Sequence, residues 1–153
     1  MSGCPFGAIT DRSYLIPVVE GLREKKKLVA TFAPAIEGQF GAANVGMLKA
    51  ALRKLGFSDV VEVSLGADAT AWHEAQELKE AVQNKQKMTT SCCPAFVEMI
   101  EKHFPRLIPN ISHTGSPMTL VSRYIRKNDP EAKVVFIGPC VAKKLEIRRV
   151  EDS

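Results

Sequence analysis

The chain has 153 residues, of which 45% are hydrophobic and 25% are charged, as is typical of one globular domain. The formal net charge is +4, and the one local basic run, at residues 24–27, is typical of a solvated helix end, so we expect no nucleic-acid partner. No apolar stretch approaches the ~18 residues of a membrane span, and no export signal is evident. Four cysteines in this setting indicate reduced thiols in a cytoplasmic protein, available for a metal or for catalysis.

Helical and strand patterns alternate along the chain. In the first half, apolar residues recur at helical spacing over residues 15–22, and residues 37–55 are also predicted to be helical. Strands are predicted at residues 28–33, closed by Pro34, and at residues 59–65.

The second half continues this alternation with strands at residues 87–91 and 134–137. Its helices are predicted at residues 67–83, from Pro94 onwards, at 116–126 and at 143–151, with a loop at 104–115. The whole pattern predicts an α/β fold, Rossmann-like, with a mostly parallel four-stranded sheet flanked by helices.

Two of the predicted strands deliver thiols at their ends. Cys92 and Cys93 follow the strand at 87–91, and Cys140 follows the strand at 134–137. Ligands of α/β proteins usually lie outside the carboxyl ends of the strands. Because vicinal residues point in different directions, one thiol of the pair could face an iron–sulfur cluster while the other faces a different group. A 4Fe–4S cluster needs four thiolates, so Cys93 and Cys140 alone are too few, and two buried structural cysteines are the ordinary alternative.

The N-terminal Cys4-Pro5 is similar to the end of a bacterial-type ferredoxin motif, in which the last cysteine precedes a proline. The cysteines that would come before it are absent. We therefore divide the chain into residues 1–13, a remnant of a ferredoxin-type 4Fe–4S module with Cys4 as a former metal ligand, and residues 14–153. In this chain alone, an unstructured N-terminal thiol is the alternative.

Three glycines, Gly38, Gly41 and Gly46, loosely match a nucleotide-binding loop. Their spacing does not fit the dinucleotide fingerprint and no lysine follows as in a P-loop, so close backbone packing is the favoured role. A plain Rossmann-like nucleotide-binding domain is nevertheless one alternative function.

The amino-acid sequences of the two cysteine segments resemble those of one known family. Residues 90–96, Thr-Ser-Cys-Cys-Pro-Ala-Phe, resemble the first signature of the iron-only (FeFe) hydrogenases. Residues 138–146 resemble the second signature, Pro-Cys-x-x-Lys-x-x-Glu, and the ferredoxin-like tail precedes both in the family's order. The resemblance covers essentially the whole chain. It implies the N-terminal portion of the H-cluster domain, half of a larger hydrogenase catalytic domain.

This resemblance implies roles around the H-cluster, a 4Fe–4S cluster joined to a diiron subsite. Cys93 and Cys140 would be two of four cluster thiolates, and Cys92 would donate and accept protons without binding metal. Lys143 would direct its ammonium at a cyanide ligand of the subsite. The cofactor pocket would be lined by Ala33, Pro34 and Pro139.

The resemblance also implies a proton path. Glu74 and Glu77, three apart on one helix face, match acidic members of the family's relay, and Ser112 matches its hydroxyl member. Glu146 would be an acid near the site. Ordinary solvated glutamates are the alternative for Glu74 and Glu77, and pairing with Lys or Arg is the alternative for Glu146.

The chain departs from the common hydrogenases in four ways. Phe96 replaces a Trp, Gly138 replaces a Met and Ala81 replaces an Arg of the relay, which is similar to divergent or sensory branches. The third signature, with the last two cluster ligands, is missing. We therefore expect this fragment to be inactive and its cluster to be absent or incomplete.

Two functions follow from the resemblance. The parent would interconvert protons, electrons and H2, with ferredoxin or another electron carrier and the remaining hydrogenase domain as partners. Alternatively, it would be a hydrogenase-like iron–sulfur sensor or cluster-assembly protein without turnover, but such eukaryotic relatives tend to lose the proton-shuttle thiol, which Cys92 retains. Apolar surface left by truncation could also pair two copies of the chain.

Overall fold

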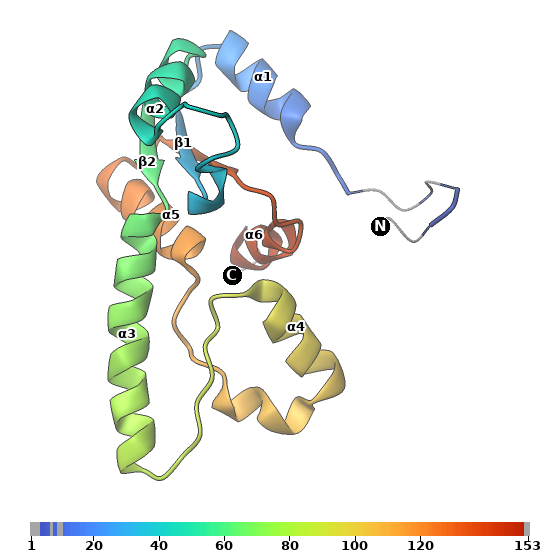
Figure 1. Cartoon of the computed structure of the whole chain (residues 1–153), viewed down its shortest axis with the longest axis vertical. Coiled ribbons are helices and arrows are strands. Elements are labelled where there is room, and N and C mark those ends of the chain that lie inside the picture. Colours follow the sequence, from blue (N-terminus) through green and yellow to red (C-terminus); the bar gives the residue numbers. More distant parts are fainter. Residues whose placement is uncertain (1–3, 7, 9–10, 152–153) are drawn as a thin grey trace.

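The structure is a computed structural model that describes residues 4–6, 8 and 11–151. It contains a parallel sheet in the order β2-β1-β3, formed by β1 (Leu28–Phe32), β2 (Asp59–Glu62) and β3 (Lys133–Ile137). The helices are α1 (Leu15–Arg23), η1 (Pro34–Ile36), α2 (Val45–Lys54), α3 (Ser64–Gln83), α4 (Pro94–His103), η2 (Pro105–Asn110), α5 (Pro117–Asn128) and α6 (Lys143–Glu151). The predicted α/β class, parallel sheet and flanking helices are confirmed (Figure 1).

Strand β1 is central and buried along its whole length, because helices cover both faces of the sheet. On one face, Phe32 and Leu28 pack with Leu52 of α2 and with the inner side of α1. On the other face, Val29 packs with Val121 and other residues of α5. Each large apolar side chain buried in this way contributes about 1.5–3 kcal/mol to folding. The strand thereby holds its carboxyl end, where the predicted site begins, in a fixed position.

The prediction of four strands is wrong, because the sheet has three. The segment at 87–91 forms only an isolated parallel bridge, between Thr89 and Ile111. The N–H of Thr89 donates to the carbonyl of Asn110 (2.8 Å), and the carbonyl of Thr89 accepts from the N–H of Ser112 (2.8 Å). Since its backbone groups find these partners outside the sheet, the segment does not pair with either edge strand, β2 or β3.

Three predicted boundaries also move. The helix predicted from residue 37 begins at Val45, because Asn44 caps it by accepting from the N–H of Met47 (2.9 Å). The second strand ends at Glu62, and Gly66 lies inside α3, where a Cβ atom would come within 2.0 Å of the Pro117 carbonyl oxygen. The predicted loop at 104–115 contains η2.

Residues 84–115, which we call the α4 lobe, lie apart from the sheet and carry α4 and η2 (Figure 1). Among the described residues, neither of the two main hydrophobic clusters includes any member of this lobe. The lobe carries Cys92 and Cys93, whereas Cys140 follows β3 of the sheet. The predicted site therefore depends on how the lobe is attached to the rest of the molecule.

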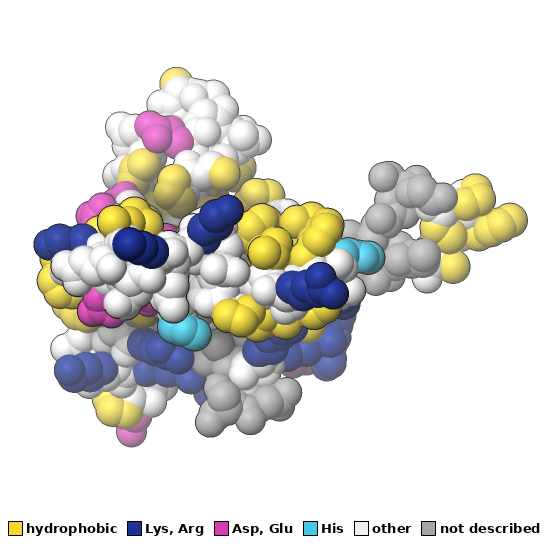
Figure 2. Space-filling view, turned by 90° about the horizontal axis from the view of Figure 1, so that it is seen from below, with side chains coloured by type: hydrophobic (Ala, Val, Ile, Leu, Met, Phe, Trp, Pro, Cys, Tyr) yellow, Lys and Arg dark blue, Asp and Glu magenta, His cyan; other side chains and the backbone are white. Residues whose placement is uncertain are grey.

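Several large apolar side chains remain exposed, among them Leu15 and Ile16 on α1 and Trp72 on α3. Viewed from below, hydrophobic side chains form separate patches between Lys and Arg side chains (Figure 2). Within the part of the chain that the structure describes, no helix combines the length and apolar character needed to cross a bilayer.

Candidate functional site

The two cysteine segments each run into the start of a helix. Cys93 has extended backbone angles and precedes α4, and its carbonyl accepts from the N–H of Val97 (3.1 Å). Pro94 takes the first helical position, where a missing N–H costs little. Cys140 precedes α6, and its carbonyl accepts from the N–H of Lys143 (3.3 Å). Both Cys93 and Cys140 are exposed and free of disulfides, while Cys92 is half-buried.

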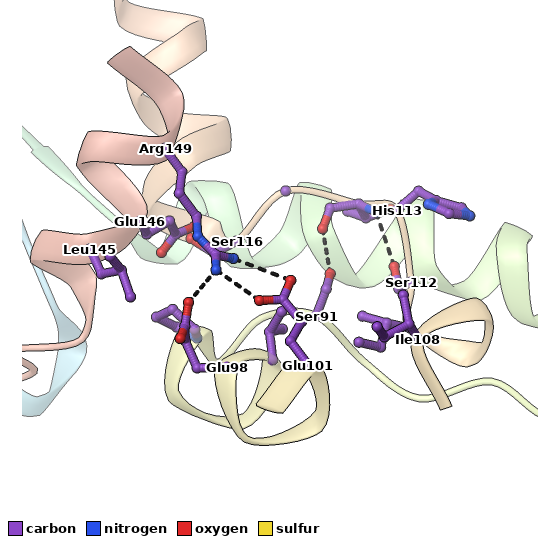
Figure 3. Close-up of a pocket in the computed structure, with 15 residues that line it drawn as sticks. Ser91, Glu98, Glu101, Ile108, Ser112, His113, Ser116, Leu145, Glu146 and Arg149 are labelled. Atoms are coloured by element: carbon purple, nitrogen blue, oxygen red, sulfur yellow. Dashed lines mark hydrogen bonds and ion pairs between the residues drawn. The ribbon is translucent and has the colours of Figure 1, made fainter. Parts of the chain in front are cut away.

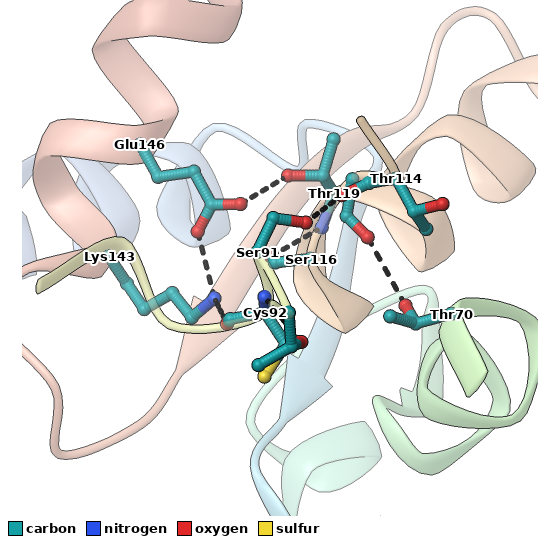
Figure 4. A network of polar contacts seen from close by, with 10 residues as sticks. Thr70, Ser91, Cys92, Thr114, Ser116, Thr119, Lys143 and Glu146 are labelled. Atoms are coloured by element: carbon teal, nitrogen blue, oxygen red, sulfur yellow. Dashed lines mark hydrogen bonds and ion pairs between the residues drawn. The ribbon is translucent and has the colours of Figure 1, made fainter. Parts of the chain in front are cut away.

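Lys143 joins the two segments. Its Nζ donates to the carbonyl oxygen of Cys92 (3.3 Å) and lies 2.8 Å from Oε2 of Glu146 (Figure 4). The side chains of Lys143 and Glu146 are only 14% and 15% exposed, so this ion pair is shielded from bulk water. Folding thus brings the second signature to the backbone of the first, although 51 residues separate Cys92 from Lys143.

A third element fixes this pair. Oγ1 of Thr119, in the first turn of α5, donates to Oε1 of Glu146 (2.7 Å) (Figure 4). The alternative for Glu146, pairing with a basic residue, is therefore realised through Lys143, at the place where the resemblance put an acid near the site. The sequence reasoning missed Thr119, because nothing in its local pattern signals a contact with a residue 27 positions away.

Glu74 attaches α3 to the segment that leads to the cysteines. Its carboxylate accepts from the hydroxyl of Thr90 (2.7 and 2.9 Å to its two oxygens) and from the N–H of Ser91 (3.0 Å). The N–H of Cys92 in turn donates to the hydroxyl of Thr90 (3.3 Å). Glu74 is therefore connected to Cys92 through one hydroxyl group.

Glu77 contacts the segment of the α4 lobe that leads from η2 to α5. It accepts from the hydroxyl of Thr114 (2.6 Å) and from the N–H of His113 (3.1 Å), and buried Ser112 lies beside it. Burial raises the pKa of Glu77, but the hydrogen bonds from Thr114, Ser112 and His113 outweigh it, so the pKa lies below its ordinary value. The sequence reasoning named Glu77 and Ser112 and missed both threonines, Thr90 and Thr114, which link them to the lobe.

A cavity of about 310 Å³ lies between the α4 lobe and α6 (Figure 3). Arg149 of α6 closes one side by pairing with Glu98 and with Glu101 (2.7 Å) of α4. The hydrogen bond that Arg149 donates to Glu101 is the main cause that raises the pKa of Arg149, and the hydrogen bond from Lys102 is the main cause that lowers the pKa of Glu98. No sequence pattern predicted this ion-pair cluster, because it depends on how α4 and α6 meet.

The residues predicted to line a cofactor pocket lie at the carboxyl edge of the sheet. The N–H of Ala33 donates to the carbonyl of Ile137 (2.9 Å), so the ends of β1 and β3 lie side by side. Pro34 begins η1, and Pro139 is exposed between β3 and α6. This places Ala33, Pro34 and Pro139 together as predicted, on the Cys140 side of the site. Their binding role stays a prediction.

The N-terminal prediction is only partly within the described residues. Cys4 is half-buried, and residues 1–3, 7 and 9–10 lie outside the described part. Nothing in the structure tests whether residues 1–13 derive from a ferredoxin module.

The thiols of the site can be compared with the ligands that an iron–sulfur cluster requires. Exposed thiols such as Cys93 and Cys140 are the ligands that these clusters take. Among the described residues, no group of three or more Cys, His, Asp or Glu side chains is arranged to hold a metal ion. The two thiols therefore fit as part of a cluster's ligand set and not as the whole of it.

Residues 26–153 match the family described as the iron-only hydrogenase large subunit, C-terminal domain. The chain belongs to this family. It is 31% identical to iron hydrogenase 1 of Clostridium pasteurianum, over 95% of this chain and 29% of that one. It is 34% identical to the periplasmic Fe hydrogenase large subunit of Nitratidesulfovibrio vulgaris, over 92% of this chain and 38% of that one. The chain thus spans about a third of these relatives.

Two further matches extend the comparison. The cytosolic Fe–S cluster assembly factor NAR1 of Yarrowia lipolytica is 32% identical, over 81% of this chain and 26% of its own length. A variant of the apo FeFe-hydrogenase HydA1 from Chlamydomonas reinhardtii has a similar structure, with a TM-score of 0.74 and 28% identity, over 88% of this chain and 40% of that one. The family therefore includes both named hydrogenases and named assembly factors.

Proposed function

We propose that this chain supplies two thiolates, a proton-carrying thiol and a fixed ammonium to the H-cluster of an enzyme that interconverts protons, electrons and H2. The observation that supports this most directly is the hydrogen bond from Lys143 to the carbonyl of Cys92, because it unites the two hydrogenase signatures. Cys93 and Cys140 would hold the cluster, and polypeptide outside the described residues would supply the other ligands. When bound, the cluster would supply the redox chemistry.

The residues of the chain would carry protons to this centre. Glu77 and Ser112 are neighbours on the α4-lobe side of α3, and Glu74 is linked through the Thr90 hydroxyl to the backbone N–H of Cys92. The lowered pKa of Glu77 keeps it ionised at neutral pH, so it would begin each transfer as a proton acceptor. The half-buried thiol of Cys92 would make the last transfer. Lys143 would present positive charge in a site shielded from water.

The partners and location belong to the same proposal. A hydrogenase needs an electron carrier, and we propose ferredoxin or a similar protein, together with the remaining hydrogenase domain. We propose a cytoplasmic location, because four cysteines in this chain are typical of reduced thiols. Relatives named as periplasmic and as cytosolic both exist, so fractionation of cells is the direct check.

The second candidate is a role in iron–sulfur assembly or sensing without turnover, which the likeness to NAR1 proteins favours. The two functions differ in what they require of Cys92. A turnover enzyme needs this thiol for proton transfer, whereas a non-catalytic protein needs only thiols that bind the cluster.

Cysteine substitutions test the proposal. In the full-length polypeptide, Cys92→Ser is expected to keep the iron and sulfide content and to lose H2 turnover, whereas Cys93→Ser and Cys140→Ser lose both. Anaerobic iron and sulfide analysis with an H2-evolution assay measures this, with the wild-type protein as the reference. Unchanged iron content in Cys93→Ser and Cys140→Ser would overturn the proposed ligands. Full turnover in Cys92→Ser would overturn the proton-carrying role of this thiol. No turnover in the wild type with iron present would favour the second candidate.

A further inference from the structure

Thr119 is a buried polar residue to which none of the roles above is assigned. It is 6% exposed and lies in the first turn of α5, where its N–H donates to the capping hydroxyl of Ser116 (3.4 Å). Its methyl group packs against Gly115, since a Cβ atom built there would lie 3.3 Å from Thr119 Cγ2. The methyl group and the helix start thus set the direction of the hydroxyl, which donates to Glu146 (2.7 Å).

The first turn of α5 is itself held rigidly. Helix α3 approaches it so closely that any side chain at Gly66 would collide with the carbonyl oxygen of Pro117. The hydroxyl of Thr70 on α3 also donates to the carbonyl of Gly115 (3.2 Å), directly before this turn. Thr119 therefore projects from a fixed part of the molecule towards α6.

We propose that Thr119 is a positioning residue that holds Lys143 against the carbonyl of Cys92 by orienting Glu146 (Figure 4). Glu146 has two carboxylate oxygens with different partners: Oε1 accepts from Thr119 and Oε2 pairs with Nζ of Lys143 (2.8 Å). Fixing one oxygen fixes the plane of the carboxylate and therefore the place of the ammonium. The relevance of this chain of contacts to H2 chemistry rests on the proposed function.

The test measures the freedom of the Lys143 amine in the full, cluster-free chain. Amine acetylation followed by mass spectrometry gives a rate for each lysine, with Lys49, which pairs with Glu62 (2.5 Å), as the internal reference. Thr119→Val removes the hydroxyl and keeps the shape, so we expect Lys143 to be modified about fivefold faster. Thr119→Ser keeps the hydroxyl and is expected to stay within about twofold of wild type. Thr31→Val, which removes a buried hydroxyl that has no hydrogen-bond partner among the described residues, is the matched control and should leave Lys143 unchanged.

A double variant distinguishes positioning of Lys143 by Thr119 from a general loosening of the fold. In Glu146→Ala, Lys143 is released directly, so adding Thr119→Val should have no further effect on its rate. An unchanged rate in Thr119→Val, an equal increase in Thr31→Val, or an additive effect in Glu146→Ala would each overturn the proposal. If Thr119→Val does not fold by circular dichroism, Thr119→Ala is used in its place, and Thr119→Ser must still retain the protected lysine. Because no cluster or H2 is involved, failure of the proposed function leaves this result readable.

Discussion

The side chain of Lys143 meets two kinds of oxygen at once, a backbone carbonyl and a carboxylate. Taking an ammonium out of water is costly, and the partly buried Glu146 offsets that cost only while the pair keeps its geometry. An exposed lysine at the start of a helix would need no such partner. The burial of the pair is therefore a stronger indication of a site than the sequence motif alone.

Gly138 carries the first prediction. A Cβ atom at this position would lie 2.6 Å from Cζ of the Phe136 ring, so any side chain requires the ring to move. We expect Gly138→Ala to reduce the free energy of unfolding by about 1–3 kcal/mol, as overpacking does elsewhere. Urea unfolding followed by circular dichroism measures this.

The control for this prediction removes the end of the ring. In Phe136→Leu, the added methyl group of Gly138→Ala has room, so its cost should fall to less than half. An equal cost in both backgrounds would show that the strain lies in the backbone at Gly138 and not at the ring. The methionine of the common hydrogenases is thus incompatible with the present position of Phe136.

At the scale of residues, the sequence singled out the thiols and Lys143 because their signatures are local, and their roles stay predictions. The structure shows Lys143 joining the two segments as a folded contact. Thr119 and Arg149 could not be predicted in this way. Their partners lie on other helices, and one threonine or arginine on a helix gives no indication of its neighbour in space.

Among the elements, the segment at 87–91 shows where pattern reasoning fails. Its β-branched residues and the following Pro94 have the properties of a strand, and Thr89 does form one bridge. A segment joins a sheet only if an unpaired edge is within reach, and this one is drawn to α3 by Glu74 instead. Parallel pairing of β1 with β2 and β3 was predictable, whereas membership of the sheet was not.

Glu77 on α3 carries the second prediction, which concerns pH. Its folded-state pKa is lowered, so its stabilising hydrogen bonds are fully present above the ordinary value of 4.5 and are lost as the pH falls through the lowered value. Wild type should therefore lose stability below about pH 4.5 relative to Glu77→Gln, whose side chain does not titrate. Urea unfolding of both proteins across this range measures the difference.

A glutamine at an exposed position of the same helix is the control for this pH effect. Glu80→Gln should follow wild type across the range, because the side chain of Glu80 is exposed and makes no hydrogen bond to the α4 lobe among the described contacts. A constant difference between wild type and Glu77→Gln would show that the carboxylate charge does not hold the lobe.

In the whole molecule, the predicted site spans two parts that are held together by different kinds of interaction. The sheet and its covering helices are held by apolar packing, while the described attachments of the α4 lobe to them are largely polar, through Glu74, Glu77, Lys143 and Arg149. The attachment through Arg149 is about half exposed, and such contacts contribute little each and weaken with salt. The lobe should therefore open before the core unfolds.

Arg149 gives the third prediction, because it pairs with two glutamates of α4 and is itself 48% exposed. Removing it by Arg149→Ala should leave global unfolding within about 1 kcal/mol of wild type. Proteolytic cleavage within residues 84–115 should nevertheless become several-fold faster, and about 0.5 M salt should have the same effect on wild type.

The matched control is Arg53→Ala, which removes an exposed ion pair with Asp59 on the surface of the sheet and its covering helices. Equal acceleration in that control, or cleavage that rises only with global unfolding, would show that the lobe and the core form one cooperative unit. The two thiol segments would then be held together by the whole fold and not by this polar junction.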